Sequence, residues 1–324
     1  MNPTVSVDVH LAPADWAAVL ATEVRAGLAA TPKVLSPVWF YDERGSGLFD
    51  EITRLDEYYL TRAERAILTT HAANIAHLTG ASTLVELGAG TSDKTRLLIE
   101  AMRDHGSLER FIPFDVSEQT LRSASATIAD EYGLSVRAVV GDFHRHLALL
   151  PREGRRLIAF LGGTIGNLDP VQRQCFFTAL STTMEADEWF LIGTDLVKDP
   201  HRLLAAYDDA RGVTAEFNRN ALRVLNLQLG ADFDPEAFDH LALWNVEEAW
   251  IEMRLRARRA QHVHIDQLDL DVDFAAGEDL WTEISAKFTP VGLGEELASA
   301  GFAIEASWTD PDGDFLLTLA RLQD

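Results

Sequence analysis

The sequence is poor in cysteine and in positive charge. Its single cysteine, Cys175, cannot form an intrachain disulfide, and its apolar neighbours in RQCFFTAL predict a packed side chain rather than a nucleophile or a metal ligand. The 28 lysines and arginines are outnumbered by 51 aspartates and glutamates, so the formal net charge of −23 repels phosphate backbones and anionic lipid surfaces. We therefore expect no nucleic-acid or membrane partner.

Long apolar runs, internal repeats and low-complexity segments are also lacking. No stretch reaches the roughly 18 apolar residues of a membrane span, and the first residues are acidic and polar where a signal peptide carries its apolar core. These absences predict a cytoplasmic globular protein, and we expect a monomer. The 324 residues, 47% of them hydrophobic, suffice for one large domain or two interleaved ones.

What is present is an alternation of short apolar runs and helical patterns between about residues 63 and 196. TLVEL is followed by DKTRLLIEAM, and RFIPFDV by SEQTLRSASATIADEY. Such alternation predicts an α/β fold with a parallel sheet between helices. Between about residues 200 and 287 one long helical segment precedes alternating, strand-like stretches. We interpret this part as an inserted α+β domain, because a helix closed by Gly301 and a hairpin around PDG can complete the earlier sheet.

The turn after TLVEL contains Gly88 and Gly90 as G-x-G, where a missing Cβ lets backbone approach a ligand. The third glycine of the dinucleotide fingerprint is absent, since Asp93 occupies its position. An acidic residue at the start of a helix is unfavourable for a pyrophosphate. The turn therefore suits S-adenosylmethionine, which is cationic and has no phosphate, better than NAD.

Two acidic residues end the next two expected strands. Asp115 can accept both hydroxyls of a ribose, and Asp142, followed by Phe143, suits an adenine ring and its amine. Taken singly, each aspartate is better explained as a helix N-cap, and it is their occurrence on successive strand ends that favours a ligand. Lys94 could bind the methionyl carboxylate of the cofactor, or be a solvated helix lysine.

Four segments, ELGAGTSDKTR, FIPFDVS, GDF and FLGGTIGNL, together resemble the class I S-adenosylmethionine-dependent methyltransferases. The similarity is specific to the histidine Nα-methyltransferases of ergothioneine biosynthesis, because it continues through WFYDERGSGLFDEITRLDEYYLTRAE and DLDVDFAAGEDLWTEISAKF. The resemblance implies a Rossmann-like, doubly wound sheet at residues 62–197 plus 288–324 that binds S-adenosylmethionine. It also implies a smaller substrate-binding domain at residues 1–61 plus 198–287. The implied reaction is trimethylation of the α-amine of L-histidine to hercynine.

The resemblance also implies site residues. Those for the cofactor are Gly88, Lys94, Asp115, Asp142 and Phe143. Those for the substrate are Tyr58, Asn167, Tyr207, Met253, Glu283 and Ser285, with Tyr41 also lining the pocket; Tyr41 and Asn167 are the candidates for direct catalytic roles.

The residues of the substrate set can also be judged by their own chemistry. Glu283 and Ser285 would share one face of a strand and could bind the two nitrogens of an imidazole, although a solvated strand face is the simpler interpretation. Tyrosines beside apolar residues usually belong to the rim of a core. Asn167 could orient the substrate amine, with Gly162 and Gly163 leaving room for added methyl groups.

Three further patterns are candidates for a calcium loop, a histidine metal site and a hydrolase nucleophile, and each lacks a required residue. Asp269, Asp271 and Asp273 lack the glycine and glutamate of an EF-hand loop, and His262 with His264 lacks a credible third ligand, so we expect no metal. GGTIGN contains no serine for a hydrolase nucleophile. The open alternative is an α-N-methyltransferase for another amino acid, such as tryptophan.

Overall fold

The computed structural model describes residues 4–11, 13–90 and 92–323, in which the chain divides into two compact units. The larger unit contains Met1–Ala12, Leu60–Val197 and Phe288–Asp324, and the smaller unit contains Pro13–Tyr59 and Lys198–Lys287. The smaller unit is thus contributed by two segments, one of them an insertion before the last helix and hairpin. The first strand belongs to the larger unit, so the expectation that residues 1–61 as a whole join the smaller domain is wrong for Val5–Val9.

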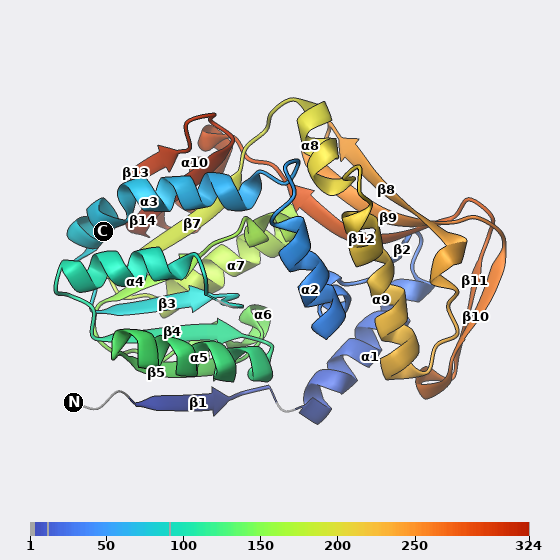
Figure 1. Ribbon diagram of the computed structural model, residues 1–324, viewed down its shortest axis with the longest axis horizontal. Helices are drawn as coiled ribbons and strands as arrows, with labels where there is room; N and C mark the ends of the chain where they lie inside the picture. Colours follow the sequence, from blue (N-terminus) through green and yellow to red (C-terminus); the bar gives the residue numbers. More distant parts are fainter. Residues whose placement is uncertain (1–3, 12, 91, 324) are drawn as a thin grey trace. The chain divides into compact units, whose positions relative to one another are not determined.

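The larger unit is built on an eight-stranded sheet (Figure 1). Its strands in sequence order are β1 (Val5–Val9), β3 (Thr83–Leu87), β4 (Arg110–Asp115), β5 (Ser135–Val140), β6 (Arg156–Phe160), β7 (Trp189–Asp195), β13 (Phe302–Thr309) and β14 (Phe315–Leu322). Its helices are α3 (Leu60–Thr79), α4 (Thr95–Asp104), α5 (Glu118–Tyr132), α6 (Phe143–His146), α7 (Pro170–Thr183) and α10 (Pro290–Ser299), with short 3₁₀ turns η2 (Leu147–Leu149) and η3 (Thr164–Asn167).

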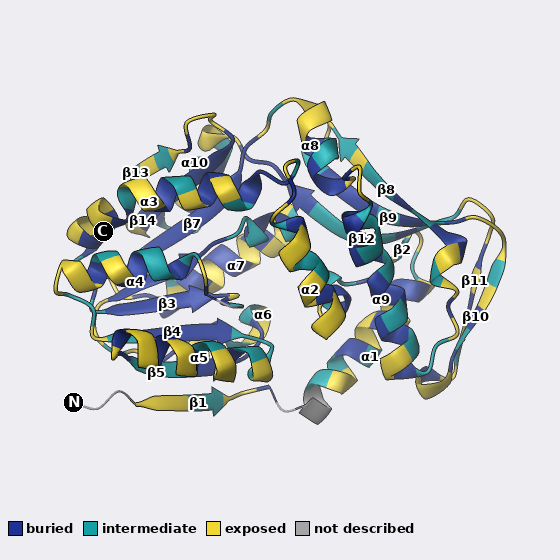
Figure 2. Ribbon diagram, viewed as in Figure 1, coloured by how far each residue is buried: buried dark blue, intermediate teal, exposed yellow. Residues whose placement is uncertain are grey.

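The strand order is β1-β5-β4-β3-β6-β7-β14-β13. The first six strands are parallel, whereas β14 runs antiparallel to both β7 and β13. Every residue of β3 is buried (Figure 2). The same holds for β6, as both faces of a covered parallel sheet require. The chain order reverses at β3, which pairs with β4 on one side and β6 on the other. Ligands of open α/β sheets bind at such a switch point, beyond the carboxyl ends of the strands.

The smaller unit contains a four-stranded sheet in the order β2-β12-β9-β8 and a two-stranded ribbon, β10-β11. The strands are β2 (Lys33–Val34), β8 (Phe238–Asn245), β9 (Trp250–Ala257), β10 (Gln261–Ile265), β11 (Leu270–Phe274) and β12 (Asp279–Ala286). The helices are α1 (Pro13–Ala29), α2 (Glu43–Ile52), α8 (Pro200–Tyr207) and α9 (Val213–Leu229), with 3₁₀ turns η1 (Pro37–Phe40), η4 (Pro235–Ala237) and η5 (Asp266–Leu268). Strands β8, β9 and β12 are antiparallel, as their alternating pattern predicted.

Two local expectations from sequence are corrected by the structure. The helical segment after residue 200 is two helices, because Gly212 adopts a φ of +73° and the Asp209 carboxylate caps α9 through the amides of Val213 and Thr214. Cys175 is exposed on α7, although its neighbours Phe176 and Phe177 are buried. None of the described helices is both long and apolar enough to cross a bilayer.

Candidate cofactor and substrate sites

The chain of the larger unit turns sharply where β3 ends. Gly88 and Gly90 adopt φ values of +68° and +49°, a conformation that residues with a Cβ rarely adopt. A Cβ at Gly90 would meet no heavy atom within 4 Å, and one at Gly88 would only touch the Phe160 ring at 4.0 Å. The backbone conformation therefore requires both glycines, and the space beside them is not filled by protein.

Asp115, at the end of β4, holds this turn in place. One carboxylate oxygen accepts the Gly90 amide at 3.0 Å, and the other accepts the Ser117 amide at 3.0 Å. Burial raises the pKa of Asp115, while these backbone hydrogen bonds oppose the rise. A carboxylate has about four lone-pair sites, more than these amides fill, so Asp115 can still accept from a ligand hydroxyl. Asp115 therefore fits the ribose-binding role and also orders the glycine turn.

Asp142 and Phe143 follow β5 at the same edge of the sheet. Asp142 is the N-cap of α6, since its carboxylate accepts the His144 amide at 2.9 Å, and a capping carboxylate retains a second oxygen. The Phe143 ring is half-buried and packs edge-on against Phe160 and Phe176, with centroids 5.3 and 5.9 Å away. These contacts fix the ring while leaving part of it accessible to a planar ligand.

Lys94, expected at the methionyl carboxylate, forms an ion pair with Glu64 of α3. The Glu64 carboxylate is completely buried, and its two oxygens accept the Gly162 amide at 2.8 and 3.0 Å. A Cβ at Gly193 of β7 would lie 2.2 Å from Glu64 Oε1, so only glycine fits there. Glu64 thereby connects Lys94 to the loop after β6. The sequence analysis missed this residue, although its position among Leu60, Ala63, Ile67 and Leu68 on the buried face of α3 was a usable signal.

Glu86 of β3 is a second buried carboxyl in this region. It is 4% exposed, and burial raises its pKa to about 7, although the Thr95 hydroxyl and the Lys94 ammonium oppose the rise. Thr95 donates to Oε1, whereas Oε2 has no hydrogen-bond partner among the described residues. A buried acceptor without a partner suits a cationic ligand group. Together with the open glycine turn and two strand-end aspartates, it fits a cationic, phosphate-free nucleoside, and S-adenosylmethionine meets this description.

In the smaller unit, Glu283 and Ser285 lie on β12. Opposite them in the antiparallel pair are Met253 and Ile251 of β9, so Glu283 and Met253 share one face of the sheet. Desolvation raises the pKa of the half-buried Glu283 to about 7, and the Lys287 ammonium opposes the rise. No side chain in the described parts of the chain forms a hydrogen bond with the Glu283 carboxylate, so it is free to accept one from a ligand.

Tyr207, at the end of α8, contacts this face of β12. Its hydroxyl lies 2.7 Å from Ser285 Oγ, and Lys287 Nζ donates to both hydroxyls, at 2.9 Å to Tyr207 and 2.8 Å to Ser285. All three residues are buried. Lys287 was missed by the sequence analysis, although it continues the alternation of Glu283 and Ser285 by two residues.

Tyr41 and Tyr58 continue the same cluster through aromatic contacts. The Tyr58 ring packs edge-on against Tyr207 at 6.4 Å and against Phe49 at 6.2 Å, and Phe49 contacts Tyr41 at 5.9 Å. Tyr58 is 8% exposed and Tyr41 is 50% exposed. The smaller unit thus brings together six of the seven residues named for the substrate: Tyr41, Tyr58, Tyr207, Met253, Glu283 and Ser285.

The seventh residue, Asn167, lies in the larger unit, in η3 directly after the β6 loop. Its side chain is half-buried and forms no hydrogen bond with any described residue, so its amide is available to a ligand. Gly162 and Gly163, which precede η3, have positive φ values of +82° and +70°. Because Glu64 binds the Gly162 amide, the loop that carries Asn167 is fixed to α3.

Neither group of potential metal ligands supports a metal assignment. His262 and His264 of β10 pair with Asp273 and Asp271 of β11 on an exposed ribbon.

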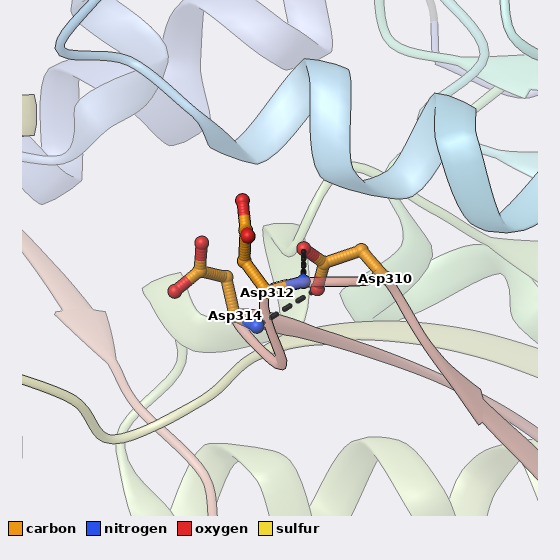
Figure 3. Close-up of side chains that lie close together, drawn as sticks. All are labelled: Asp310, Asp312 and Asp314. Carbon is orange, nitrogen blue, oxygen red and sulfur yellow. Dashed lines mark hydrogen bonds between the residues drawn. The ribbon is translucent and has the colours of Figure 1, made fainter.

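The carboxylates of Asp310, Asp312 and Asp314 gather in the loop between β13 and β14 (Figure 3). The Asp310 carboxylate accepts hydrogen bonds from the amides of Asp312, Asp314 and Phe315. The hydrogen bonds of the turn therefore account for the close approach of these residues without a metal ion.

The chain is similar to known methyltransferases over nearly its whole length. A family model described as "Histidine-specific methyltransferase, SAM-dependent" matches residues 20–322. The histidine N-alpha-methyltransferase of Mycolicibacterium smegmatis is 57% identical over 98% of this chain and 99% of its own length. That of Mycobacterium tuberculosis is 54% identical, with the same coverage of both chains. An L-tryptophan methyltransferase of Psilocybe serbica is 24% identical over 91% of this chain and 90% of its own. The chain therefore belongs to the histidine-specific, S-adenosylmethionine-dependent methyltransferase family.

Proposed function

We propose that this protein methylates the α-amino nitrogen of L-histidine three times, giving the trimethylated product hercynine. The observation that carries the proposal is the pair formed by Glu283 and Ser285, which offers an acceptor and a hydroxyl on one face of β12. The imidazole ring has two nitrogens that need such partners. The names of the two mycobacterial relatives support the same substrate.

In this proposal the cofactor residues and most of the substrate residues belong to different units. The larger unit binds S-adenosylmethionine through Gly88, Lys94, Asp115, Asp142 and Phe143. The smaller unit supplies Tyr41, Tyr58, Tyr207, Met253, Glu283 and Ser285 for histidine. Asn167, in the larger unit, orients the substrate amine.

Catalysis rests mainly on positioning. Bound S-adenosylmethionine supplies an electrophilic methyl group on a positively charged sulfur. The amine must be neutral and in line with that group, about 3 Å away, and such alignment can contribute on the order of 7–11 kcal/mol. Positive charge moves from sulfur to nitrogen and no oxyanion forms, so the site needs no oxyanion hole. The substrate nitrogen is itself the nucleophile, so the chain does not have to supply one. The amide oxygen of Asn167 accepts from the amine and directs its lone pair.

Each of the first two products must lose a proton before the nitrogen can react again. We assign this proton to solvent through Tyr41, whose ring is held by Phe49 and Phe217 while 50% of the residue stays exposed. Tyr58 provides a phenolic donor for the substrate carboxylate. Gly162 and Gly163, without side chains, leave space for a nitrogen that grows by successive methyl groups.

The test is a competition among amino acids. The purified protein is incubated with S-adenosylmethionine and an equimolar mixture of the standard amino acids, and the products are identified by mass spectrometry. We expect histidine alone to gain one, two and finally three CH₂ units. Methylated tryptophan as the main product, or no product on histidine, would contradict the proposal.

Tryptophan is the serious competitor because its indole N–H could also donate to Glu283. The indole has no second ring nitrogen, however, so the hydrogen of the Ser285 hydroxyl would lose its acceptor on the ligand. A buried polar group left without a partner costs about 1–3 kcal/mol, which favours histidine by roughly 5- to 150-fold.

A further inference from the structure

Lys287 is a buried charged residue to which neither the sequence motifs nor the proposed reaction assigns a role. It follows β12 directly, and the residue is 4% exposed. Its ammonium donates to Ser285 Oγ at 2.8 Å and to Tyr207 Oη at 2.9 Å, and it lies 4.6 Å from the centroid of the Tyr207 ring. The cation is thus held against both hydroxyls of the substrate face.

The Lys287 ammonium limits the hydrogen bonds that Ser285 can form with a ligand. A lysine ammonium only donates, whereas a hydroxyl has one hydrogen and two lone pairs. Lys287 fills one lone pair of Ser285. The Tyr207 hydroxyl lies 2.7 Å from the same oxygen. We take Tyr207 as the donor in this pair, to the second lone pair of Ser285, because a phenol is more acidic than an aliphatic hydroxyl. With both lone pairs filled, Ser285 can only donate to a ligand.

Glu283, two residues earlier on the same face, has the complementary property. Its carboxylate accepts no hydrogen bond from any described side chain, so a ligand N–H can donate to it. The face therefore presents one acceptor and one obligate donor. A neutral imidazole has one N–H and one bare nitrogen, and it matches this pair in a single tautomer.

We propose that Lys287 is a positioning residue that determines specificity, because it forces Ser285 to donate to the bare nitrogen of the substrate ring. This inference rests on the proposed histidine methylation and adds a residue to it. Without the ammonium, Ser285 would regain a free lone pair and could turn to accept an N–H. The face would then discriminate less well between imidazole and rings that lack a bare nitrogen.

The experiment replaces Lys287 by methionine, which keeps the length of the side chain and removes its charge and its hydrogens. Steady-state kinetics are measured with L-histidine and with β-(2-thienyl)-L-alanine, whose five-membered ring has no nitrogen. We expect KM for histidine to rise about tenfold in K287M, the upper range for one hydrogen bond, with a much smaller change in kcat. The KM for thienylalanine should change less than twofold, so the preference for histidine falls.

Two further variants show whether Lys287 acts through Ser285. In a double-mutant cycle with Ser285→Ala, the two effects on KM for histidine should be non-additive, because the alanine variant has no hydroxyl to orient. Lys287→Gln retains two N–H donors without the charge, so it should recover part of the loss seen in K287M. It also serves in place of K287M if the methionine variant does not fold.

Lys33→Met is the matched control, since Lys33 of β2 forms an ion pair with Glu278 and pairs with Leu280 at the start of β12 rather than with Glu283 or Ser285. It should leave KM for histidine unchanged. Binding of S-adenosylmethionine, measured by calorimetry, should be the same in all variants. An unchanged KM in K287M, an equal loss for both substrates, or additive effects with S285A would overturn the inference. Absence of histidine methylation by the unaltered protein would instead refute the proposed function.

Discussion

The cofactor region of the larger unit and the substrate region of the smaller unit are built in different ways. Most of the residues proposed for the cofactor follow the ends of adjacent parallel strands. Glycine turns and hydrogen bonds from backbone amides shape this region. The substrate residues come from a helix end, a loop and two antiparallel strands, and their side chains contact one another directly. Strand-end motifs are local and can be recognised in sequence, whereas a network of side chains from distant segments cannot.

Among substitutions that test this difference between the two units, we expect the largest effect from Asp115 in the larger unit. Replacing it by alanine removes the proposed acceptor for two ribose hydroxyls and also the partner of the Gly90 and Ser117 amides. Each hydrogen bond to a charged group contributes about 1.5–3 kcal/mol, so affinity for S-adenosylmethionine should fall more than a hundredfold. Calorimetric titration measures the change.

Asp187→Ala is the control for that variant, because it removes the same charge from a residue whose side chain is 65% exposed and pairs with Arg155. Its affinity for S-adenosylmethionine should stay within about threefold of the original, as is usual for a surface ion pair. If the two variants behave alike, Asp115 does not bind the ribose.

The corresponding change in the smaller unit is Glu283→Ala. It removes the proposed acceptor for the imidazole N–H and should lower histidine affinity by about 1.5–3 kcal/mol, or roughly 10- to 150-fold. Affinity for S-adenosylmethionine should be unaffected, since Glu283 belongs to the other unit. Histidine binding by calorimetry that equals that of the unaltered protein would disprove the assignment.

A smaller effect is expected from Glu64→Gln in the larger unit. The amide oxygen can still accept the Gly162 N–H, but the charge that pairs with Lys94 is lost. The free energy of unfolding should fall by roughly 1–2 kcal/mol in urea titrations, because the pair is mostly buried. Glu131→Gln, which removes the exposed partner of Arg96, should cost less than about 0.5 kcal/mol. Equal costs would mean that burial adds nothing to the Glu64 pair.

The smallest effect concerns pH and involves one carboxyl in each unit. The pKa values of Glu86 and Glu283 are raised from 4.5 to about 7 by burial, so between these values the folded protein binds more protons than the unfolded chain. Stability from these groups is therefore present at low pH and is lost as pH rises toward 7. Glu283→Gln should reduce the loss in Tm between about pH 5 and pH 8. An identical pH profile would show that Glu283 titrates normally.

Several parts of the fold were predictable because their signals are short-range. Alternation of apolar runs with helical patterns indicated the parallel sheet, and PDG between two apolar stretches indicated the hairpin of β13 and β14. Other parts depend on distant partners. Pairing of Val5–Val9 with β5 joins residues about 130 positions apart, and no local pattern in the first strand indicates its partner. The exposure of Cys175 depends on which face of α7 meets the sheet.

The sequence by itself determined the glycine turn and the strand-end aspartates, because positive φ angles and strand ends are properties of a few consecutive residues. It also contained Glu283 and Ser285 at a spacing that places both on one strand face, while their link to histidine depended on a family resemblance. Only the tertiary structure decided that Tyr207, 78 residues before Ser285, shares its hydroxyl with that serine and with Lys287. Hydrogen bonds between distant segments exist only after the helix and the strand have packed, so the donor and acceptor pattern of the substrate face is a property of the folded chain.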